Sequence, residues 1–449
     1  MTPFKTRQIP DAPRYWLKRA RVPLCFLPNG LRAERDRDSA ALVDILVGKE
    51  SIAAIEPAGV ASSVDVPALD LETRQVWPAL IDMHAHLDKG HVVARIENPD
   101  GSFAGARQAT SADRAQRWTA EDIRRRMEFG LRCAYAHGVA AIRTHLDSHE
   151  SEQARRSWAV FREMRDRWAG RIALQAVALA PIDAFRTPFG DELADLVAGS
   201  GGVLGGVTRA AQGVHGELLD DIDPLLDKVL RLAAERGLDV DLHVDESGDP
   251  AAAALGRIAA AVLRNRFKGR VVCGHCCSLS VQPEEQIQRT LDLCAEAGIA
   301  VVTLPTVNLY LQDRYAGRTP RWRGVAPVHE MRRRGIAVAV AGDNCRDPFH
   351  AYGDHDMVDT FRQAVRILHL DHPLADVPAM VGPVPQAITR IGPLGTIAVG
   401  APARLILFNA RTLNELICRP QSDRLVIDRG RMVVDALPDY AELDALGVA

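Results

Sequence analysis

Two histidines separated by one residue, His84 and His86, are the first side chains in the sequence with the spacing of a metal site. They follow a short apolar run, and residues i and i+2 of a strand point to the same face, so both imidazoles can reach one point. Imidazole is the commonest metal ligand in proteins because its pKa of about 6.5 leaves it mostly unprotonated at neutral pH. A His-x-His pair also occurs without any function, so it needs partners elsewhere in the chain.

Three partners stand at the ends of other apolar runs, namely His243, His275 and Asp343. A buried core does not accept such polar residues unless they are paired or coordinated. Three of these four histidines, taken as neutral, and the one carboxylate would suit Zn²⁺ or Fe²⁺, with one position left open for water. The residues therefore indicate a catalytic metal centre, and the choice between the two metals stays open.

Eight apolar, β-branched runs alternate with helical stretches between residues 79 and 342, which is typical of βαβ units and a parallel sheet. Eight such repeats fit a (β/α)₈ TIM-type barrel, whose chemistry lies at the carboxyl ends of the strands. The polar residues named above end the first, fifth, sixth and eighth runs. The eight predicted strands cover residues 79–86, 139–145, 172–180, 203–207, 240–244, 271–275, 299–304 and 336–342.

The two ends of the chain have a different pattern, with short alternating runs separated by turn residues. These runs predict small antiparallel strands, which are expected to form a small β-sandwich domain built from both termini. We expect residues 1–77 and 395–449 to form this domain and residues 78–394 to form the barrel. The predicted terminal strands cover residues 43–47, 52–55, 405–408, 425–427 and 432–434.

The composition narrows the class of protein. The chain has 449 residues, of which 47% are hydrophobic and 25% charged, and its formal net charge of −3 gives no reason to expect a nucleic acid or an anionic membrane as partner. Eight scattered cysteines predict reduced thiols. Without a signal-like start or an apolar run of about 18 residues, we expect a soluble cytoplasmic protein with a small-molecule partner. A homo-oligomer is compatible with the sequence.

Several segments resemble the amidohydrolase superfamily, and most closely its bacterial cytosine deaminase branch. The match runs in the same order from about residue 77 to residue 410. The resemblance implies an enzyme, a metal-dependent hydrolase that cleaves a C–N bond of a small nitrogen heterocycle with hydroxide held by the metal as nucleophile. The segments that carry it are residues 81–88 (IDMHAHLD), 143–147 (RTHLD), 243–246 (HVDE), 274–275 (GH), 307–312 (VNLYLQ), 342–343 (GD) and 347–349 (DPF).

The resemblance also implies roles for individual residues. Glu246 would carry a proton to the substrate nitrogen, His275 would orient or polarise the attacking water, and Asp343 would accept the proton of that water as well as bind the metal. The implied metal ligands are His84, His86, His243 and Asp343.

The number of metals follows from the lysines. Many relatives hold two metals bridged by a carbamylated lysine on the fourth strand, but no lysine lies between Lys89 and Lys228, and Lys228 falls within a predicted helix. We therefore expect one divalent metal ion, Zn²⁺ or Fe²⁺, and no other cofactor.

The sequence departs from the cytosine deaminase pattern where the substrate would be recognised. Ile182 stands in place of a glutamine that reads the amide edge of the pyrimidine, Asn344 in place of an aspartate, and Phe349 in place of a tryptophan, whereas Gln312 lies in a matching segment. We predict these four residues as substrate contacts. Because buried donors and acceptors without partners are costly, cytosine should be disfavoured. The first function class is therefore an aminohydrolase that releases ammonia or an alkylamine from a triazine-, pyrimidine-, pterin- or creatinine-like ring. An apolar wall at Ile182 favours N-alkylated or ring-substituted heterocycles as substrates.

Two other interpretations stay open at this point. The site could serve a cyclic amidase that opens a ring or cleaves an exocyclic amide, or the barrel could persist without catalysis as a binding or assembly module. The complete set of ligands and proton carriers argues against the second. His145 and Asp147 could support the metal centre or contact the substrate. Cys273, Cys276 and Cys277 are interpreted as buried thiols near His275, because no second ligand pair for a zinc site accompanies them.

Overall fold

A computed structural model of the chain describes residues 8–28, 38–60, 65–211 and 218–446. The chain divides into two compact units. Unit 1 comprises Met1–Asp82, Arg132–Ala141 and Asp356–Leu437, and unit 2 comprises Met83–Leu131, Ile142–His355 and Pro438–Ala449. All the side chains predicted for chemistry lie in unit 2.

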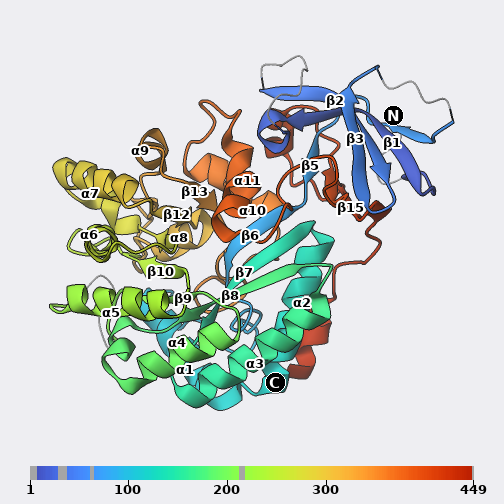
Figure 1. Ribbon diagram of the computed structural model, residues 1–449. Helices are drawn as coiled ribbons and strands as arrows, with labels where there is room; N and C mark the ends of the chain where they lie inside the picture. Colours follow the sequence, from blue (N-terminus) through green and yellow to red (C-terminus); the bar gives the residue numbers. More distant parts are fainter. Residues whose placement is uncertain (1–7, 29–37, 61–64, 212–217, 447–449) are drawn as a thin grey trace. The chain divides into compact units, whose positions relative to one another are not determined.

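Unit 1 contains two four-stranded sheets (Figure 1), with strand orders β3-β2-β1-β4 and β16-β15-β14-β5. In the first sheet β2 pairs antiparallel with both β1 and β3, and in the second β14 pairs antiparallel with β5 and β15. Both ends of the chain thus contribute strands to unit 1. The strands are β1 (Arg14–Pro23), β2 (Ala40–Gly48), β3 (Ser51–Pro57), β4 (Ala68–Asp70), β5 (Val76–Pro78), β14 (Leu405–Leu407), β15 (Leu425–Asp428) and β16 (Arg431–Met432).

The core of unit 1 is aromatic. The ring of Trp77 lies 5.1–5.6 Å from the rings of Phe26, Phe361 and Phe408, and none of the four side chains is exposed. The long strand β1 was missed by the sequence analysis. It is rich in arginine and lysine, which obscures its alternation, although Tyr15 and Leu17 are buried.

Unit 2 is built on parallel strands, as the sequence predicted. A five-stranded sheet has the order β13-β12-β11-β10-β9, and its neighbouring strands are parallel. A three-stranded sheet has the order β6-β7-β8. Isolated parallel bridges join Val177 to Val203 and Ala85 to Asp343. All eight predicted runs are strands, namely β6 (Leu80–Ala85), β7 (Val139–Asp147), β8 (Ala173–Leu179), β9 (Leu204–Val207), β10 (Val240–Val244), β11 (Val271–His275), β12 (Ala300–Thr303) and β13 (Val338–Val340).

Helices follow most of these strands. In α5 the residues Leu225, Val229 and Leu232 recur at helical spacing and are buried, which explains why the segment forms an amphipathic helix. Lys228 belongs to the same helix, as predicted, and binds Asp191 at 3.1 Å. The longer helices are α1 (Phe103–Arg117), α2 (Ala120–Ala136), α3 (Ser151–Trp168), α4 (Pro188–Gly199), α5 (Ile222–Glu235), α6 (Ala254–Asn265), α7 (Glu284–Glu296) and α10 (Met357–Ile367), and the shorter ones are α8 (Pro305–Leu311), α9 (Val328–Arg333), α11 (Pro383–Thr389) and α12 (Leu413–Cys418).

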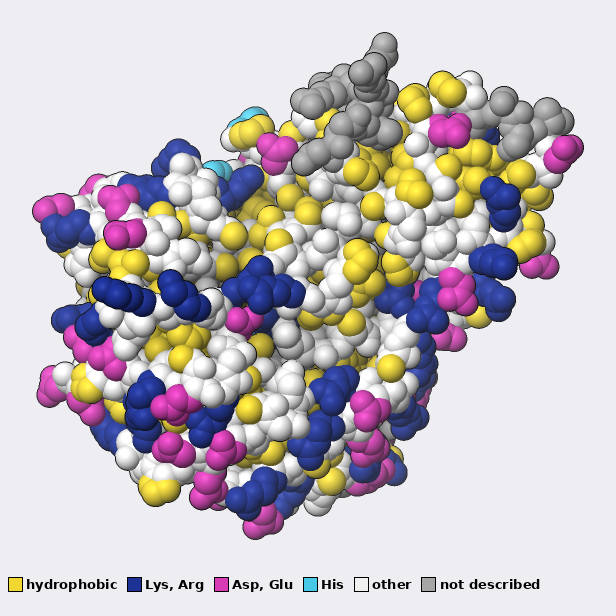
Figure 2. Space-filling view, viewed as in Figure 1, with side chains coloured by type: hydrophobic (Ala, Val, Ile, Leu, Met, Phe, Trp, Pro, Cys, Tyr) yellow, Lys and Arg dark blue, Asp and Glu magenta, His cyan; other side chains and the backbone are white. Residues whose placement is uncertain are grey.

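The outer faces of these helices carry charges of both signs. Figure 2 shows basic and acidic side chains interspersed over one face of the molecule. Many of them form exposed ion pairs between neighbouring helices, such as Arg155 with Glu192 and Arg257 with Asp223. None of the helices in the described parts of the chain has the length and apolar character needed to cross a bilayer.

A buried ion pair ties three strands of unit 2 together. Arg143 in β7 donates to Asp241 in β10 at 2.7 Å and to Gln175 in β8 at 2.7 Å, and Arg143 and Asp241 are at most 1% exposed. Burial raises the pKa of Asp241 to about 6, against the opposing charge of Arg143. The carboxylate therefore depends on this guanidinium to stay ionised.

Replacing Arg143 by Met should destabilise the protein by about 3–5 kcal/mol, because it leaves a buried carboxylate without its counter-charge. Urea-induced unfolding followed by circular dichroism measures the loss. The control is Arg257→Met, which breaks an exposed pair and should cost only about 0–1 kcal/mol. Equal effects of the two substitutions would contradict the assigned role of the buried pair.

Candidate active site

Four predicted ligand atoms converge in unit 2. Nε2 of His243 lies 3.1 Å from Nε2 of His84 and 3.3 Å from Nε2 of His86. Oδ1 of Asp343 lies 3.1 Å from Nε2 of His86 and 3.6 Å from Nε2 of His84. Ligands about 2.0–2.1 Å from a tetrahedral Zn²⁺ are separated by about 3.3–3.4 Å, so these spacings fit one metal ion. The four residues are at most 6% exposed.

The strands position these donors. His84 lies in β6 and His243 in β10, while Asp343 follows β13 and joins the end of β6 through a backbone hydrogen bond to the carbonyl of His84 at 2.7 Å. Gly274 makes room for the ring of His84, because a Cβ there would lie 3.0 Å from Cε1 of His84. Asp343 and His275 have φ values of 67° and 68°, a strained backbone region for these residues that is common at functional sites.

Neighbouring groups hold the rings in place. Nδ1 of His86 donates to the backbone carbonyl of His145 at 3.2 Å, which leaves Nε2 as the free ligand atom. The ring of His145 stacks on that of His84 at 3.8 Å between centroids, and its Nε2 lies 4.0 Å from Asp241. His145 thus lies behind the metal ligands, in the supporting position that was one of its two predicted roles.

Burial determines the protonation of the cluster. It lowers the pKa of His84 and His243 well below the usual value, so both rings are neutral and can bind a metal. Burial opposes ionisation of Asp343, but the neighbouring His86 and His275 hold its pKa below the usual value. Its Oδ2 has no hydrogen-bond partner among the described residues. A buried carboxylate with a free oxygen beside three neutral imidazoles fits a divalent cation.

Glu246 and His275 lie beside this cluster. Oε1 of Glu246 is 3.5 Å from Nδ1 of His275, and the side-chain amide of Asn308 donates to both, at 3.5 Å and 2.9 Å. Because Nδ1 accepts this bond, neutral His275 carries its proton on Nε2. Burial lowers the pKa of His275 to about 4. Burial and, next, the charge of Asp343 raise the pKa of Glu246 well above its usual value, as a proton carrier requires.

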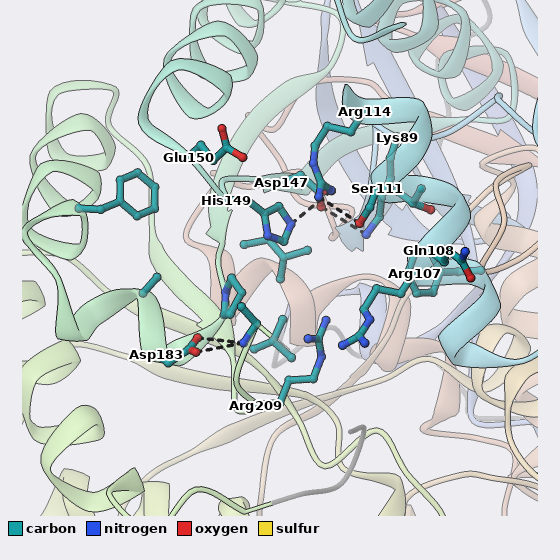
Figure 3. Close-up of a pocket in the computed structure, with 18 of the residues that line it drawn as sticks. Lys89, Arg107, Gln108, Ser111, Arg114, Asp147, His149, Glu150, Asp183 and Arg209 are labelled. Carbon is teal, nitrogen blue, oxygen red and sulfur yellow. Dashed lines mark hydrogen bonds and ion pairs between the residues drawn. The ribbon is translucent and has the colours of Figure 1, made fainter. Parts of the chain in front are cut away.

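A cavity of about 1000 Å³ lies in the same unit (Figure 3). Lys89 and Arg209, which line it, oppose the rise in the pKa of Glu246, so the cavity is within electrostatic reach of the proposed proton carrier. Asp147 also lines the cavity and binds Arg114 at 2.7 Å and Lys89 at 3.6 Å. It therefore forms part of the cavity wall, and its contact with substrate stays a prediction.

Two arginines give the cavity a basic side. Figure 3 shows the guanidinium groups of Arg107, from α1, and Arg209, from the segment after β9, pointing toward one another. Burial and then the charge of Arg107 lower the pKa of Arg209 to about 10. Neither arginine was singled out by the sequence analysis. The same is true of Asn308, although it lies within the matched segment 307–312.

The four predicted substrate contacts have different surroundings. Phe349 lines the cavity, and Nζ of Lys89 lies 4.9 Å from its ring centroid. Ile182 is fully buried, whereas Pro181 and Asp183 on either side of it line the cavity. Asn344 donates to Asp347 at 2.6 Å, and Gln312 donates to the backbone carbonyl of Glu246 at 3.3 Å. Their contacts with substrate stay predictions.

The three thiols near His275 are buried and free, as predicted. Within the described residues, they belong to no group of side chains arranged to hold a metal.

Comparison with known proteins gives concordant relatives. The profile described as "Amidohydrolase family" matches residues 103–434. A pterin deaminase of Rhizobium rhizogenes strain K84 is 50% identical over 438 residues, covering 97% of this chain and 98% of the relative. An N-isopropylammelide isopropyl amidohydrolase of Pseudomonas sp. strain ADP is 25% identical over 82% of this chain and 87% of the relative.

The fold is also that of solved structures. The crystal structure of 5-methylcytosine deaminase from Klebsiella pneumoniae with 5-fluorocytosine superposes with a TM-score of 0.80. It is 24% identical in sequence, and the match covers 94% of this chain and 97% of that one.

Replacing His243 by Ala should remove one equivalent of bound metal, because a site with four donors then keeps three. Elemental analysis of protein purified with zinc in the medium measures the change. His149→Ala removes a histidine outside the cluster and should leave the metal content unaltered. A metal content that is the same in His243→Ala as in the unsubstituted protein would refute the ligand assignment.

Proposed function

This chain belongs to the amidohydrolase family, and we propose that it is a metal-dependent deaminase that removes an amino group from a pterin-like heterocycle by hydrolysis. The observation that carries the proposal is the convergence of His84, His86, His243 and Asp343 beside Glu246 and His275. The pterin class is supported by the relative that is 50% identical over nearly the whole chain.

We further infer that β6 to β13 close into the predicted (β/α)₈ barrel. The two isolated parallel bridges support closure, since Val177 with Val203 links β8 to β9 and Ala85 with Asp343 links the end of β6 to the segment after β13. The two terminal sheets are proposed to form the small β-sandwich. The domain limits 1–77, 78–394 and 395–449 stay predictions.

His84, His86, His243 and Asp343 would hold one divalent metal, Zn²⁺ or Fe²⁺. When bound, such an ion would lower the pKa of a coordinated water from 15.7 to about 7 and so supply a hydroxide nucleophile. Asp343, besides holding the ion, would accept a proton from the attacking water. His275, with its proton on Nε2, donates a hydrogen bond that orients the nucleophile.

Glu246 moves the protons on the substrate side. It protonates the ring nitrogen next to the carbon that bears the amino group, while the water oxygen adds to that carbon. Asp343 then passes the proton that it took from water to the amino nitrogen, and the C–N bond breaks with release of ammonia. The hydroxyl proton of the former tetrahedral carbon returns to Glu246, which leaves an oxo-substituted ring and both carboxyl groups in their starting states. Asn308 positions Glu246 and His275 for this transfer, because its amide bonds both.

The cavity suits a substituted bicyclic ring. Its volume of about 1000 Å³ is at the upper end of the usual range for small-ligand sites. Phe349 offers an aromatic face, and Arg107 and Arg209 can bind oxo or carboxylate oxygens of the ring or its substituents. The second relative, an N-isopropylammelide hydrolase, makes release of an alkylamine from a triazine the second candidate activity.

Glu246→Gln should retain its metal and lose about 10²–10⁴-fold in kcat, because general acid–base catalysis by one residue contributes that much. Steady-state ammonia release with pterin, together with elemental analysis, tests this. The matched control is Glu296→Gln, an exposed carboxylate at the end of α7. Loss of metal in Glu246→Gln would make Glu246 a ligand, and full activity would exclude it as proton carrier.

Pterin should be a better substrate than cytosine by a factor of at least about 30 in kcat/KM, because two unpaired polar groups on a misfitting ring cost about 1–3 kcal/mol each. The assay compares pterin, cytosine and N-isopropylammelide on metal-loaded protein and measures released ammonia, released amine and ring opening separately. Comparable kcat/KM values for cytosine and pterin would contradict the proposed substrate class. Ring opening without ammonia would favour the cyclic amidase instead.

A further inference from the structure

A second group of metal-competent side chains lies in unit 2, apart from the proposed catalytic residues. His91, Cys345 and His355 each offer one ligand atom, and these atoms lie within 4.8 Å of one another. The three residues are 6%, 3% and 7% exposed. We propose that they form a second site for a zinc-like divalent ion.

The imidazole of His91 is the first argument for a ligand. Neither of its ring nitrogens has a hydrogen-bond partner among the described residues, although the side chain is more than nine-tenths buried. A buried polar group normally has at least one such partner. The ring instead lies against Phe129, at 4.8 Å between centroids, and His355, at 5.4 Å. A metal ion between the three side chains would satisfy one of these nitrogens.

The donor set determines the class of metal. Two neutral imidazoles and one thiolate suit zinc, with a fourth position for water. Around zinc such donors are separated by about 3.3–3.7 Å, so small side-chain rotations close the present spacing. The Cys345 thiol gives up its proton to solvent as the ion binds. A cavity of about 250 Å³, lined by His91, Arg346 and Tyr440 among others, lies beside the cluster.

The surrounding backbone is shaped around these side chains. His91 and His355 have φ values of 60° and 53°, in the left-handed region that non-glycine residues seldom adopt. Gly130 makes room for His355, because a Cβ there would lie 2.9 Å from Nε2 of that ring. At Gly353 a Cβ would lie 3.4 Å from the Cys345 sulfur.

The second cluster lies on the loops that also carry the proposed catalytic ligands, and this location suggests what a bound ion would do. His91 lies five residues after His86, and Cys345 two residues after Asp343, so the second cluster uses the same two loops as the catalytic cluster. These loops already bond to one another, since the amide of His91 donates to the carbonyl of Cys345 at 3.1 Å. A metal held by both loops would cross-link the segments that carry His86 and Asp343 and would keep those ligands in register.

Cobalt distinguishes the two sites, because only the second one contains sulfur. Protein produced with Co²⁺ as the sole added transition metal should contain about two cobalt ions per chain and should show a near-ultraviolet thiolate-to-cobalt charge-transfer band. Cys345→Ser should abolish the band and lower the cobalt content by about one equivalent. The matched control is Cys294→Ser, another buried free thiol, which should keep both.

Wild-type protein with about one cobalt per chain and no thiolate band would overturn the proposal, as would two cobalt ions without that band. A band that survives Cys345→Ser would also overturn it, because another thiol would then be the ligand. If Cys345→Ser does not fold, the wild-type spectrum decides the matter, and His91→Ala offers a second variant that should lose one cobalt while keeping the visible bands of the catalytic ion.

Discussion

The enclosure of one carboxylate among neutral imidazoles is the constraint on which the rest of unit 2 depends. Asp343 is 1% exposed, and burial keeps the neighbouring His84 and His243 rings uncharged, so they cannot neutralise it. A desolvated carboxylate is costly unless a cation balances it. The strands bring the donors to spacings that suit one divalent ion, and Gly274 and the left-handed backbone of Asp343 are adaptations to that geometry.

Much of this arrangement could be predicted because strands impose simple rules. A buried parallel strand reads as an apolar run, so the eight strands of unit 2 were identified within a few residues of their observed limits. The carboxyl ends of such strands meet at one edge, so polar residues at those ends, such as His243 and Asp343, were expected to converge. Both rules use only local sequence. Where local sequence is ambiguous they fail, as at β1, whose arginines and lysines masked a strand with buried Tyr15 and Leu17.

The remainder of the site could not be derived in this way, because it depends on where loops and helices return to the strand ends. Arg107 comes from α1 and Arg209 from the segment after β9, and nothing in their spacing indicates that the two guanidinium groups face each other. Asn308 was noticed only as part of a matched segment, and its bonds to Glu246 and His275 appear only in three dimensions. His91, Cys345 and His355 are likewise separated along the chain and meet only after folding.

The residues proposed for the reaction lie at strand ends, whereas those proposed for substrate recognition lie on loops and helices. The proposed metal ligands lie at strand ends. Because a displacement of one donor atom would alter the spacing that suits a metal ion, these positions tolerate little change. The cavity wall is built from α1, from the turn that contains Pro181 and Asp183, and from the segment that contains Phe349. Side chains on such segments can change without moving the donors. A chain can therefore keep its hydrolytic centre while the side chains of its cavity wall change. In this chain Ile182 is buried, and Arg107 and Arg209 line the cavity.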